Sequence, residues 1–245
     1  MDPKILFIDI ETFPSLVHVW RMYEDNALDT IEPPLICCFS AKWYGGTHIT
    51  KALPDYKSKP NDDSKLVKDL WKLANEADIL VAHNGKRFDF GKMNARFVKH
   101  GLQPPAPYQK VDTREMAKRA FSFEANSLDY LCQYLGLGKK MNTGGYELWQ
   151  RCMANDPEAW KLMKKYNEND VVMLERLYFA LMPWVSNHPN ISLYRGKCPR
   201  CGSEKIQSRG TARTATRSYH RYQCTDCGGW SRDTAKFAKT TFTNI

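Results

Sequence analysis

Two carboxylates near the start of the chain are spaced so that a strand would place them side by side. Asp9 and Glu11 lie two residues apart in the β-branched and aromatic run Ile5–Thr12, which predicts a strand. Residues i and i+2 of a strand point to the same face, so the two charges would repel each other and lose hydration on burial. A hard divalent cation, Mg²⁺ or Mn²⁺, would relieve that repulsion. The alternative is that both side chains meet solvent and bind nothing.

A third carboxylate follows a second short strand. Residues 79–82 are apolar, His83-Asn84-Gly85 form a turn, and Asp89 comes in or near the first turn of the next predicted helix. Sites in α/β sheets collect where strands end. Asp89 is therefore a candidate ligand if it faces Asp9 and Glu11. Otherwise it is a surface group that complements the helix dipole.

A fourth carboxylate is paired with a phenol. Tyr166 and Asp170 are four residues apart in a long helix that Asp156-Pro157 is predicted to open. Side chains at i and i+4 lie on the same helical face. A phenol and a carboxylate can thus be offered to one site, although such polar pairs are common on helices.

Four cysteines near the end of the chain have the spacing of a metal site. Cys198, Cys201, Cys224 and Cys227 form C-x2-C, then 22 residues, then C-x2-C. In an intracellular protein this pattern predicts four thiolates around one structural Zn²⁺. A pair of disulfides is the alternative. Cys37, Cys38, Cys132 and Cys152 lie in apolar or helical contexts and are expected to be small buried hydrophobes.

The elements that position these residues alternate between strand and helix, which predicts an α/β fold. Strands are expected over 16–20, 35–44 and 47–53, the last two as a hairpin around Gly45-Gly46, with a loop at 31–34. A helix is expected over 61–77, and 111–170 should be mainly helical. Pro183 and the polar residues 186–190 predict a linker. The predicted domains are residues 1–185, which hold the carboxylates, and 191–245, a basic zinc ribbon.

Charge is concentrated in the second of these domains. The chain of 245 residues carries a formal charge of +9. Residues 191–245 contain eleven Lys or Arg and three Asp or Glu, a net +8, which suggests a polyanionic partner. No run of 18 or more apolar residues occurs, so no membrane partner is expected. The chain enters its first strand too soon for a signal peptide, which predicts a soluble, cytoplasmic protein.

Taken together, the motifs resemble the DEDD superfamily of 3′→5′ exonucleases, in its tyrosine-bearing branch. The resemblance rests on Asp9-Ile10-Glu11-Thr12, on His83-Asn84-Gly85-Lys86-Arg87-Phe88-Asp89 and on Tyr166-x-x-x-Asp170. Val111-Asp112-Thr113 and Ser127-Leu128-Asp129-Tyr130-Leu131 are similar, more specifically, to the proofreading domain of family-B DNA polymerases. The likeness covers about residues 4–182.

The resemblance implies a ribonuclease-H-like mixed sheet flanked by helices, with Asp9, Glu11, Asp89 and Asp170 converging on two Mg²⁺ or Mn²⁺ ions. It implies hydrolysis of phosphodiesters from a 3′ end, with release of nucleoside monophosphates. Tyr166 would orient the attacking water. Thr12 and Asn84 would contact the terminal nucleotide. Asp112 and Asp129 are expected to have structural roles.

Substrate contacts outside the motifs remain alternatives at this point. Lys86 and Arg87 could grip phosphate or be solvated. Arg213, Arg217 and Arg221, with Tyr219 between them, predict a ribbon surface on which a base stacks on Tyr219 or Trp230; the alternative is a solvated hairpin. A chain of this length has no room for a polymerase, so a free-standing nuclease or a subunit of a replication or repair assembly is expected. Single-stranded DNA is favoured as substrate. RNA, as for ribonuclease D, and a non-catalytic nucleic-acid-binding module are the alternatives.

Overall fold

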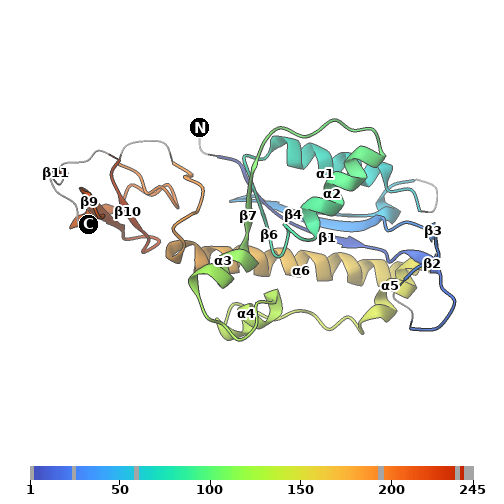
Figure 1. Ribbon diagram of the computed structural model, residues 1–245. Helices are drawn as coiled ribbons and strands as arrows, with labels where there is room; N and C mark the ends of the chain where they lie inside the picture. Colours follow the sequence, from blue (N-terminus) through green and yellow to red (C-terminus); the bar gives the residue numbers. More distant parts are fainter. Residues whose placement is uncertain (1–2, 24–25, 58–60, 193–195, 235–237, 240–245) are drawn as a thin grey trace.

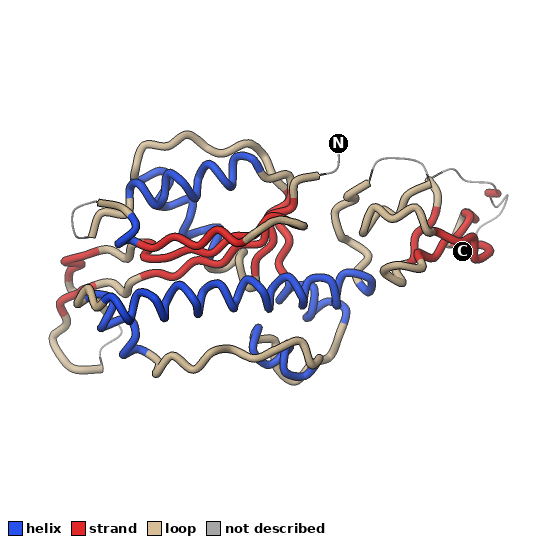
Figure 2. The backbone as a smooth tube through the Cα atoms, turned by 180° about the vertical axis from the view of Figure 1, so that it is seen from behind, coloured by secondary structure: helices blue, strands red, loops and turns tan. Residues whose placement is uncertain are grey.

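The computed structural model describes residues 3–23, 26–57, 61–192, 196–234 and 238–239. A five-stranded sheet, in the order β5-β4-β1-β6-β7, lies between layers of helices (Figures 1 and 2). β1 runs antiparallel to β4 and parallel to β6, so the sheet is mixed, as predicted. Its strands are β1 (Ile5–Thr12), β4 (Ile36–Trp43), β5 (His48–Ala52), β6 (Ile79–Ala82) and β7 (Gln109–Asp112).

Helices cover both faces of this sheet. One face is covered by α1 (Ser64–Glu76) and α2 (Asp89–Lys99), and the other by α6 (Pro157–Leu181) (Figure 1). α3 (Thr113–Ala120), α4 (Leu128–Tyr134) and α5 (Tyr146–Met153) pack against α6. Two short 3₁₀ turns, η1 (Leu53–Asp55) and η2 (Met182–Trp184), follow β5 and α6.

The alternation of β1 decides which side of the sheet carries the chemistry. Leu6, Ile8 and Ile10 belong to the core beneath α1 and α2, whereas Ile5 and Phe7 belong to the core beneath α6. Continuing that second face along the strand gives Asp9 and then Glu11. The two carboxylates therefore emerge toward α6, at the point where the apolar residues of that face end.

The long helix α6 begins where the sequence predicts. The Asp156 side chain accepts hydrogen bonds from the backbone N–H groups of Glu158 (2.9 Å) and Ala159 (3.4 Å), and Pro157 occupies the first helical position. Its residues Leu174, Leu177 and Tyr178 pack with Phe7, whose ring centroid lies 5.3 Å from that of Tyr178. Closer to the N-terminus of α6 than these apolar residues, Asp170 and Tyr166 lie beside Asp9 and Glu11.

Between β1 and β4 the prediction is only partly right. β2 (Leu16–His18) is shorter than expected and pairs antiparallel with β3 (Asp29–Glu32) in a separate two-stranded sheet. The loop predicted at 31–34 is wrong for Ile31 and Glu32, which belong to β3: Glu32 pairs with Leu16, and Ile31 lies at the irregularity in the β2–β3 register. The β4–β5 hairpin is confirmed. Ser127 caps α4, and its Oγ accepts from the Tyr130 N–H at 3.3 Å.

The C-terminal ribbon is a small sheet centred on β9 (Arg217–Cys224), which pairs antiparallel with β8 (Ile206–Arg213), β10 (Trp230–Arg232) and β11 (Ala238–Lys239). The chain makes no turn at Gly210, which lies within β8. Gly210 instead has φ of +79° and sits in a bulge between Ser208 and Thr211. The strand therefore continues to Arg213.

The ribbon lies beside the C-terminal end of α6 (Figure 2). The Arg200 guanidinium donates to the Pro183 carbonyl, and Ile191, Cys201 and Cys227 pack against the core beneath α6. Within the described part of the chain, no helix combines the length and the apolar character needed to cross a membrane.

Candidate active site

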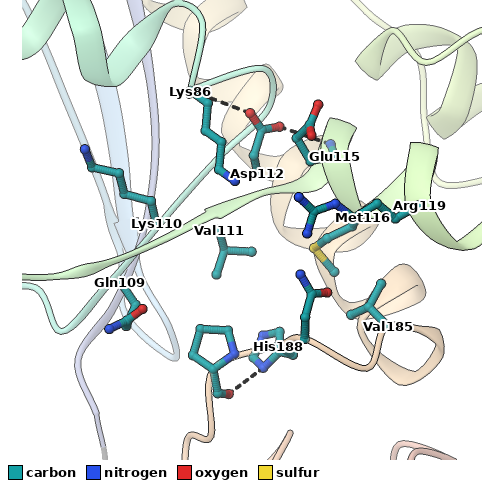
Figure 3. Close-up of a pocket in the computed structure, with 12 residues that line it drawn as sticks. Lys86, Gln109, Lys110, Val111, Asp112, Glu115, Met116, Arg119, Val185 and His188 are labelled. Carbon is teal, nitrogen blue, oxygen red and sulfur yellow. Dashed lines mark hydrogen bonds between the residues drawn. The ribbon is translucent and has the colours of Figure 1, made fainter.

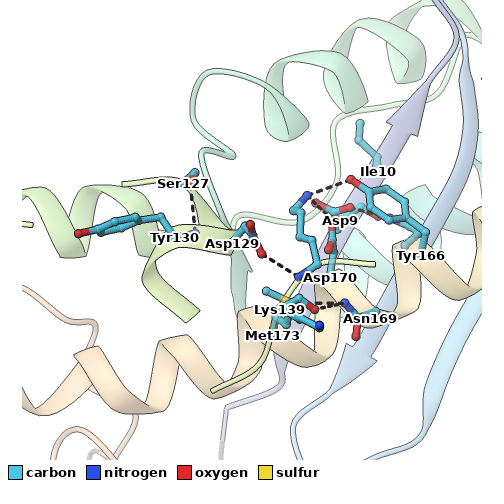
Figure 4. Close-up of polar contacts among 12 residues, drawn as sticks. Asp9, Ile10, Ser127, Asp129, Tyr130, Lys139, Tyr166, Asn169, Asp170 and Met173 are labelled. Atoms are coloured by element: carbon cyan, nitrogen blue, oxygen red, sulfur yellow. Dashed lines mark hydrogen bonds and ion pairs between the residues drawn. The ribbon is translucent and has the colours of Figure 1, made fainter. Parts of the chain in front are cut away.

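Three of the four predicted carboxylates meet at one point. Asp9 and Glu11 from β1 and Asp170 from α6 each offer an oxygen, and these oxygens lie within 4.8 Å of one another. Figure 4 shows Asp9, Tyr166 and Asp170 turned toward the same space between strand and helix. A β-bulge between Glu11 and Thr12 ends the regular pairing of β1 with β4 at this position.

Asp89 is close to this cluster but is not part of it. It is buried at the first turn of α2, and its Oδ1 accepts a hydrogen bond from the Ile10 backbone N–H at 3.2 Å. Its charge still acts on Asp9, whose pKa it helps to raise. Asp89 therefore lies close enough for its charge to act on Asp9, and its place as a fourth metal ligand stays a prediction.

The carboxylate cluster holds more negative charge than the surrounding chain stabilises. Burial, with repulsion from Asp89, Glu11 and Asp170, raises the pKa of Asp9 well above its ordinary value. Burial and the Asp170 charge raise the pKa of Glu11 to about 8, and burial raises that of Asp89 to about 7. Asp170 Oδ1 is buried and accepts no hydrogen bond from the described residues. Oxygen ligands with a vacant acceptor and excess negative charge fit Mg²⁺ or Mn²⁺.

One cation from the chain itself partly offsets this charge. Lys140 Nζ lies 2.6 Å from Asp170 Oδ2 and donates to the Tyr166 hydroxyl at 2.9 Å. Its backbone N–H is held by Asp129 Oδ1 at 2.8 Å, which gives Asp129 the structural role expected of it. Burial works against the charged ammonium, but Asp170 more than compensates and raises the Lys140 pKa. Sequence reasoning missed Lys140, because a loop lysine carries no periodic signal.

Tyr166 lies beside Asp170 and shares the Lys140 ammonium with it. Burial, followed by the charges of Asp170 and Glu11, raises the pKa of its phenol above the ordinary value, so the hydroxyl keeps its proton at neutral pH. The Trp149 ring packs edge-on against the Tyr166 ring, with centroids 6.2 Å apart. The phenol is thereby fixed beside the carboxylates.

A second residue that sequence reasoning missed is Asn167. Its side chain is fully buried, and its Nδ2 donates to Asp9 Oδ2 at 2.6 Å. A signal was present, because Asn167 lies three residues before Asp170 and such residues share a helical face. Asn167 fixes the rotamer of Asp9 and links β1 to α6.

A hollow of about 430 Å³ opens beside the cluster, lined by Asp9, Asn84 and Lys140 among others. Asn84 has φ of +64°, and its backbone N–H donates to Asp112 Oδ1 at 2.9 Å. Arg114 donates to Asn84 Oδ1, also at 2.9 Å. Asp112 accepts in addition from the Lys86 N–H, so its expected structural role is confirmed. Thr12 ends β1, partly buried, one residue beyond Glu11.

The two basic residues of the second motif point elsewhere. Lys86 and Arg87 are exposed, and neither lines the hollow beside Asp9. Lys86 instead lines a separate pocket near the connector to the ribbon. The structure thus brings Asn84 to the carboxylates and leaves Lys86 and Arg87 outside.

The four cysteines of the ribbon converge as predicted. All are free thiols, with Sγ atoms 3.7 Å apart for Cys198 and Cys227 and 3.6 Å apart for Cys201 and Cys224. A tetrahedron of sulfurs at the usual Zn–S distance of about 2.3 Å has edges of about 3.8 Å, so the cluster fits one Zn²⁺. After each C-x2-C pair a glycine with positive φ, Gly202 or Gly228, donates its N–H to the carbonyl of the first cysteine.

The predicted nucleic-acid surface of the ribbon needs a correction at Tyr219. Arg213, Arg217 and Arg221 are exposed, but Tyr219 is buried, with the Arg232 guanidinium 4.1 Å from its ring centroid. A base could stack on Tyr219 only by displacing Arg232. Trp230, the alternative, is 44% exposed and has the Arg221 guanidinium 4.9 Å from its ring.

Comparison with known protein families assigns this fold to one of them. The sequence model of the RNase_H superfamily matches residues 24–182, more than half of the chain. The chain belongs to the RNase H superfamily. The match begins after β1, so Asp9 and Glu11 are placed by the structure rather than by the family match.

A solved structure of a family-B DNA polymerase is also similar to this RNase H superfamily chain. The polymerase, from the hyperthermophilic archaeon Pyrobaculum calidifontis, has a TM-score of 0.55 and 18% sequence identity. The likeness covers 74% of this chain and 25% of the polymerase chain, so this protein spans a quarter of that relative's length. At this identity the likeness shows the fold alone. No curated protein matches the chain.

Proposed function

We propose that this protein is a metal-dependent 3′→5′ exonuclease that hydrolyses single-stranded DNA to nucleoside monophosphates. The observation that carries the proposal is the convergence of Asp9, Glu11 and Asp170 with Tyr166 around an acceptor that lacks a partner among the described residues. The RNase H superfamily membership supports phosphodiester chemistry. The resemblance of the sequence motifs to the proofreading domain of family-B DNA polymerases favours DNA over RNA.

In this proposal, Asp9, Glu11 and Asp170 would hold two divalent ions, and Asp89 would complete the set. Bound there, Mg²⁺ or Mn²⁺ supplies an activated nucleophile and stabilises charge in the transition state. The protonated Tyr166 hydroxyl donates to the attacking water and orients it. Lys140 brings a positive charge to the edge of the site where a phosphodiester approaches, and Thr12 and Asn84 contact the terminal nucleotide.

Digestion of matched 5′-labelled single-stranded DNA and RNA oligonucleotides tests the proposal. With Mg²⁺ or Mn²⁺, we expect a ladder that shortens from the 3′ end of the DNA and that Asp9→Asn does not produce. A ladder from RNA alone would support the proposed hydrolysis but with RNA rather than DNA as the substrate. Tight binding of either strand without cleavage would identify a non-catalytic binding module instead.

The water-orienting role of Tyr166 predicts a selective loss. Tyr166→Phe removes the hydroxyl and keeps the ring packed on Trp149, so we expect turnover to fall about 10- to 100-fold. The affinity for Mn²⁺, measured by calorimetry, should stay within about two-fold of wild type, because Tyr166 is not a ligand in this proposal. Unchanged turnover would reject the role.

The basic ribbon predicts a salt-dependent contribution to binding. Arg213 and Arg217 are exposed, and neither forms an ion pair with any residue that the structure describes. Replacing both with Gln should weaken oligonucleotide binding and reduce its salt slope by about 0.7 for each phosphate that the ribbon no longer neutralises. Lys65→Gln with Lys68→Gln, on α1, removes the same charge far from the ribbon and serves as the control. If the two double variants had equal salt slopes, the ribbon surface would be excluded as a site of oligonucleotide binding.

A further inference from the structure

Five aromatic side chains form a continuous row of ring contacts that links α4, the end of α3 and η2. In order of contact, the rings are those of Tyr130, Tyr134, Phe123, Phe121 and Trp184. Successive ring centroids lie 6.0, 5.4, 5.0 and 5.8 Å apart. Phe121, Phe123 and Tyr130 also pack against the core beneath α6. These five residues, called here the aromatic row, are therefore anchored to the body.

Two members of the aromatic row are open to solvent. The Tyr134 residue is 66% exposed and Trp184 is 71% exposed. Large apolar rings that a folded chain leaves in water, side by side with others, mark an interaction surface. Their flat faces suit another flat ring, because offset or edge-on contacts between rings are favourable.

One end of the aromatic row lies at the active site. Residues 126–129 line the hollow beside Asp9, and Tyr130 follows them directly in the first turn of α4. In Figure 4 the Tyr130 ring lies on the far side of Asp129 from Tyr166. The row therefore leads away from the hollow rather than into it.

The other end of the aromatic row lies at the junction with the ribbon. Trp184 belongs to η2, and the carbonyl of the preceding residue, Pro183, accepts a hydrogen bond from Arg200 of the ribbon. The connector folds against α3 here, because Arg119 of α3 and His188 of the connector line one small pocket (Figure 3). Figure 1 shows α3 at the ribbon end of α6. The row thus extends from the hollow beside the carboxylates to the ribbon.

Charge decides which kind of partner fits the aromatic row. Residues 114–140, which carry four of its five rings, contain five Lys or Arg and three Asp or Glu, and residues 191–245 beyond Trp184 carry a net +8. One of those three acids, Asp129, already accepts hydrogen bonds from Gln133 Nε2 and from the Lys140 N–H, both at 2.8 Å. A polyanion is therefore attracted to this side of the molecule.

A second group of exposed aromatic side chains has the opposite charge around it. Trp20 and Tyr23, 80% and 96% exposed, lie between β2 and β3. Residues 16–32 contain one Arg and four Asp or Glu, so this segment repels phosphate. Exposed rings and positive charge coincide at the aromatic row and not at this segment, which therefore serves as a control.

From this arrangement we propose that the aromatic row is a stacking platform for the unpaired bases of a nucleic-acid strand, upstream of its 3′ end, between the carboxylates and the ribbon. Aromatic side chains stack on any base, because every base has a π-face. Tyr134 and Trp184 receive the bases, and the three anchored rings hold them in place. The proposal rests on the proposed nuclease function and deepens it, since only a single strand can present its bases to the row.

Binding of a labelled 20-nucleotide DNA strand in an Asp9→Asn background, which blocks cleavage, tests the proposal. Tyr134→Ala with Trp184→Ala should weaken binding at least about 25-fold, at about five-fold or more for each base that no longer stacks. The slope of log K against log salt should not change, because stacking releases no counterions. Tyr134→Phe with Trp184→Phe keeps both rings and should bind within about three-fold of the parent.

The matched control is Trp20→Ala with Tyr23→Ala, which removes one Trp and one Tyr from the acidic segment. This pair should change neither the affinity nor the salt slope. If both Ala pairs weakened binding equally, the aromatic row would have no special part in holding the strand, and the stacking platform would be wrong.

A second measurement does not depend on how the variants fold. A strand that carries iodouracil upstream of its 3′ end, irradiated while bound to the Asp9→Asn protein of otherwise native sequence, should crosslink to Tyr134 or Trp184 and not to Trp20 or Tyr23, read by mass spectrometry. If the parent binds the strand but the row variants bind as tightly and no crosslink reaches the row, the stacking platform is wrong and the nuclease proposal stands. If the parent binds no strand of DNA or RNA, both proposals fail.

Discussion

Asp9→Asn is expected to abolish cleavage and, at the same time, to raise the melting temperature of the metal-free protein. Loss of a ligand carboxylate removes several kcal/mol of transition-state stabilisation, which corresponds to about 10³-fold in turnover. The gain in stability follows because desolvation of the half-buried Asp9 side chain, together with repulsion from Asp89, Glu11 and Asp170, holds its pKa well above the ordinary value. An amide of the same shape carries no charge to be repelled.

The sign of the pH dependence follows from these shifts. A carboxyl group whose pKa is raised in the folded state stabilises the fold while it is protonated and loses that contribution as pH rises. Glu11 has its pKa shifted from 4.5 to about 8 and Asp89 from 3.8 to about 7, so metal-free stability should fall between about pH 4 and pH 8. The stability of Asp9→Asn should fall less steeply, and Mg²⁺ should stabilise the wild type more than the variant.

Thermal melts with and without Mg²⁺, across that pH range, measure both effects. Glu124→Gln is the control, because it removes one carboxylate from an exposed position outside the cluster. The control should keep wild-type turnover, pH slope and response to Mg²⁺. If Asp9→Asn melted at a lower temperature than wild type without metal, the inference that the charge of Asp9 destabilises the fold would be wrong.

The parts of the site that the sequence predicts are those set by local periodicity. Asp9 and Glu11 share a face because a strand repeats every two residues, and Tyr166 and Asp170 because a helix repeats every 3.6. The apolar residues around each pair then fix which face is buried, whereas the convergence of β1 and α6 is what the family resemblance implies. The same reasoning predicts the mixed sheet and the cysteine cluster, whose spacing is also local.

The parts that the sequence does not predict depend on contacts between distant segments. Lys140 reaches Asp170 because Asp129, eleven residues away in sequence, holds its backbone. Tyr219 looks available for stacking until β10 brings Arg232 over its ring. The Lys86 pocket likewise exists only because the connector folds back against β7. No short segment of the sequence contains the information needed to predict these contacts.

Cys201→Ser is expected to remove the zinc and unfold the ribbon while the nuclease body stays folded. Structural zinc sites contribute about 10–16 kcal/mol of apparent binding free energy, which is folding free energy for a small domain. The ribbon has little else to hold it: among its described residues from 196 onward, only Cys198, Tyr219, Cys224 and Gly229 are buried. The body has its own cores on both faces of the sheet and should keep its melting transition.

Zinc content and limited proteolysis decide this prediction together. Wild type should contain one zinc per chain and resist cleavage beyond residue 196, whereas Cys201→Ser should lose the metal and be cut within the ribbon. Cys152→Ala is the matched control, because that buried thiol lies in the body, away from the cluster, and should leave zinc unchanged. A protein that contains no zinc and whose mass rises by four protons on reduction would show two disulfides instead. Because the ribbon carries Arg213 and Arg217, loss of zinc should also flatten the salt dependence of oligonucleotide binding, if the ribbon contributes to that binding as proposed.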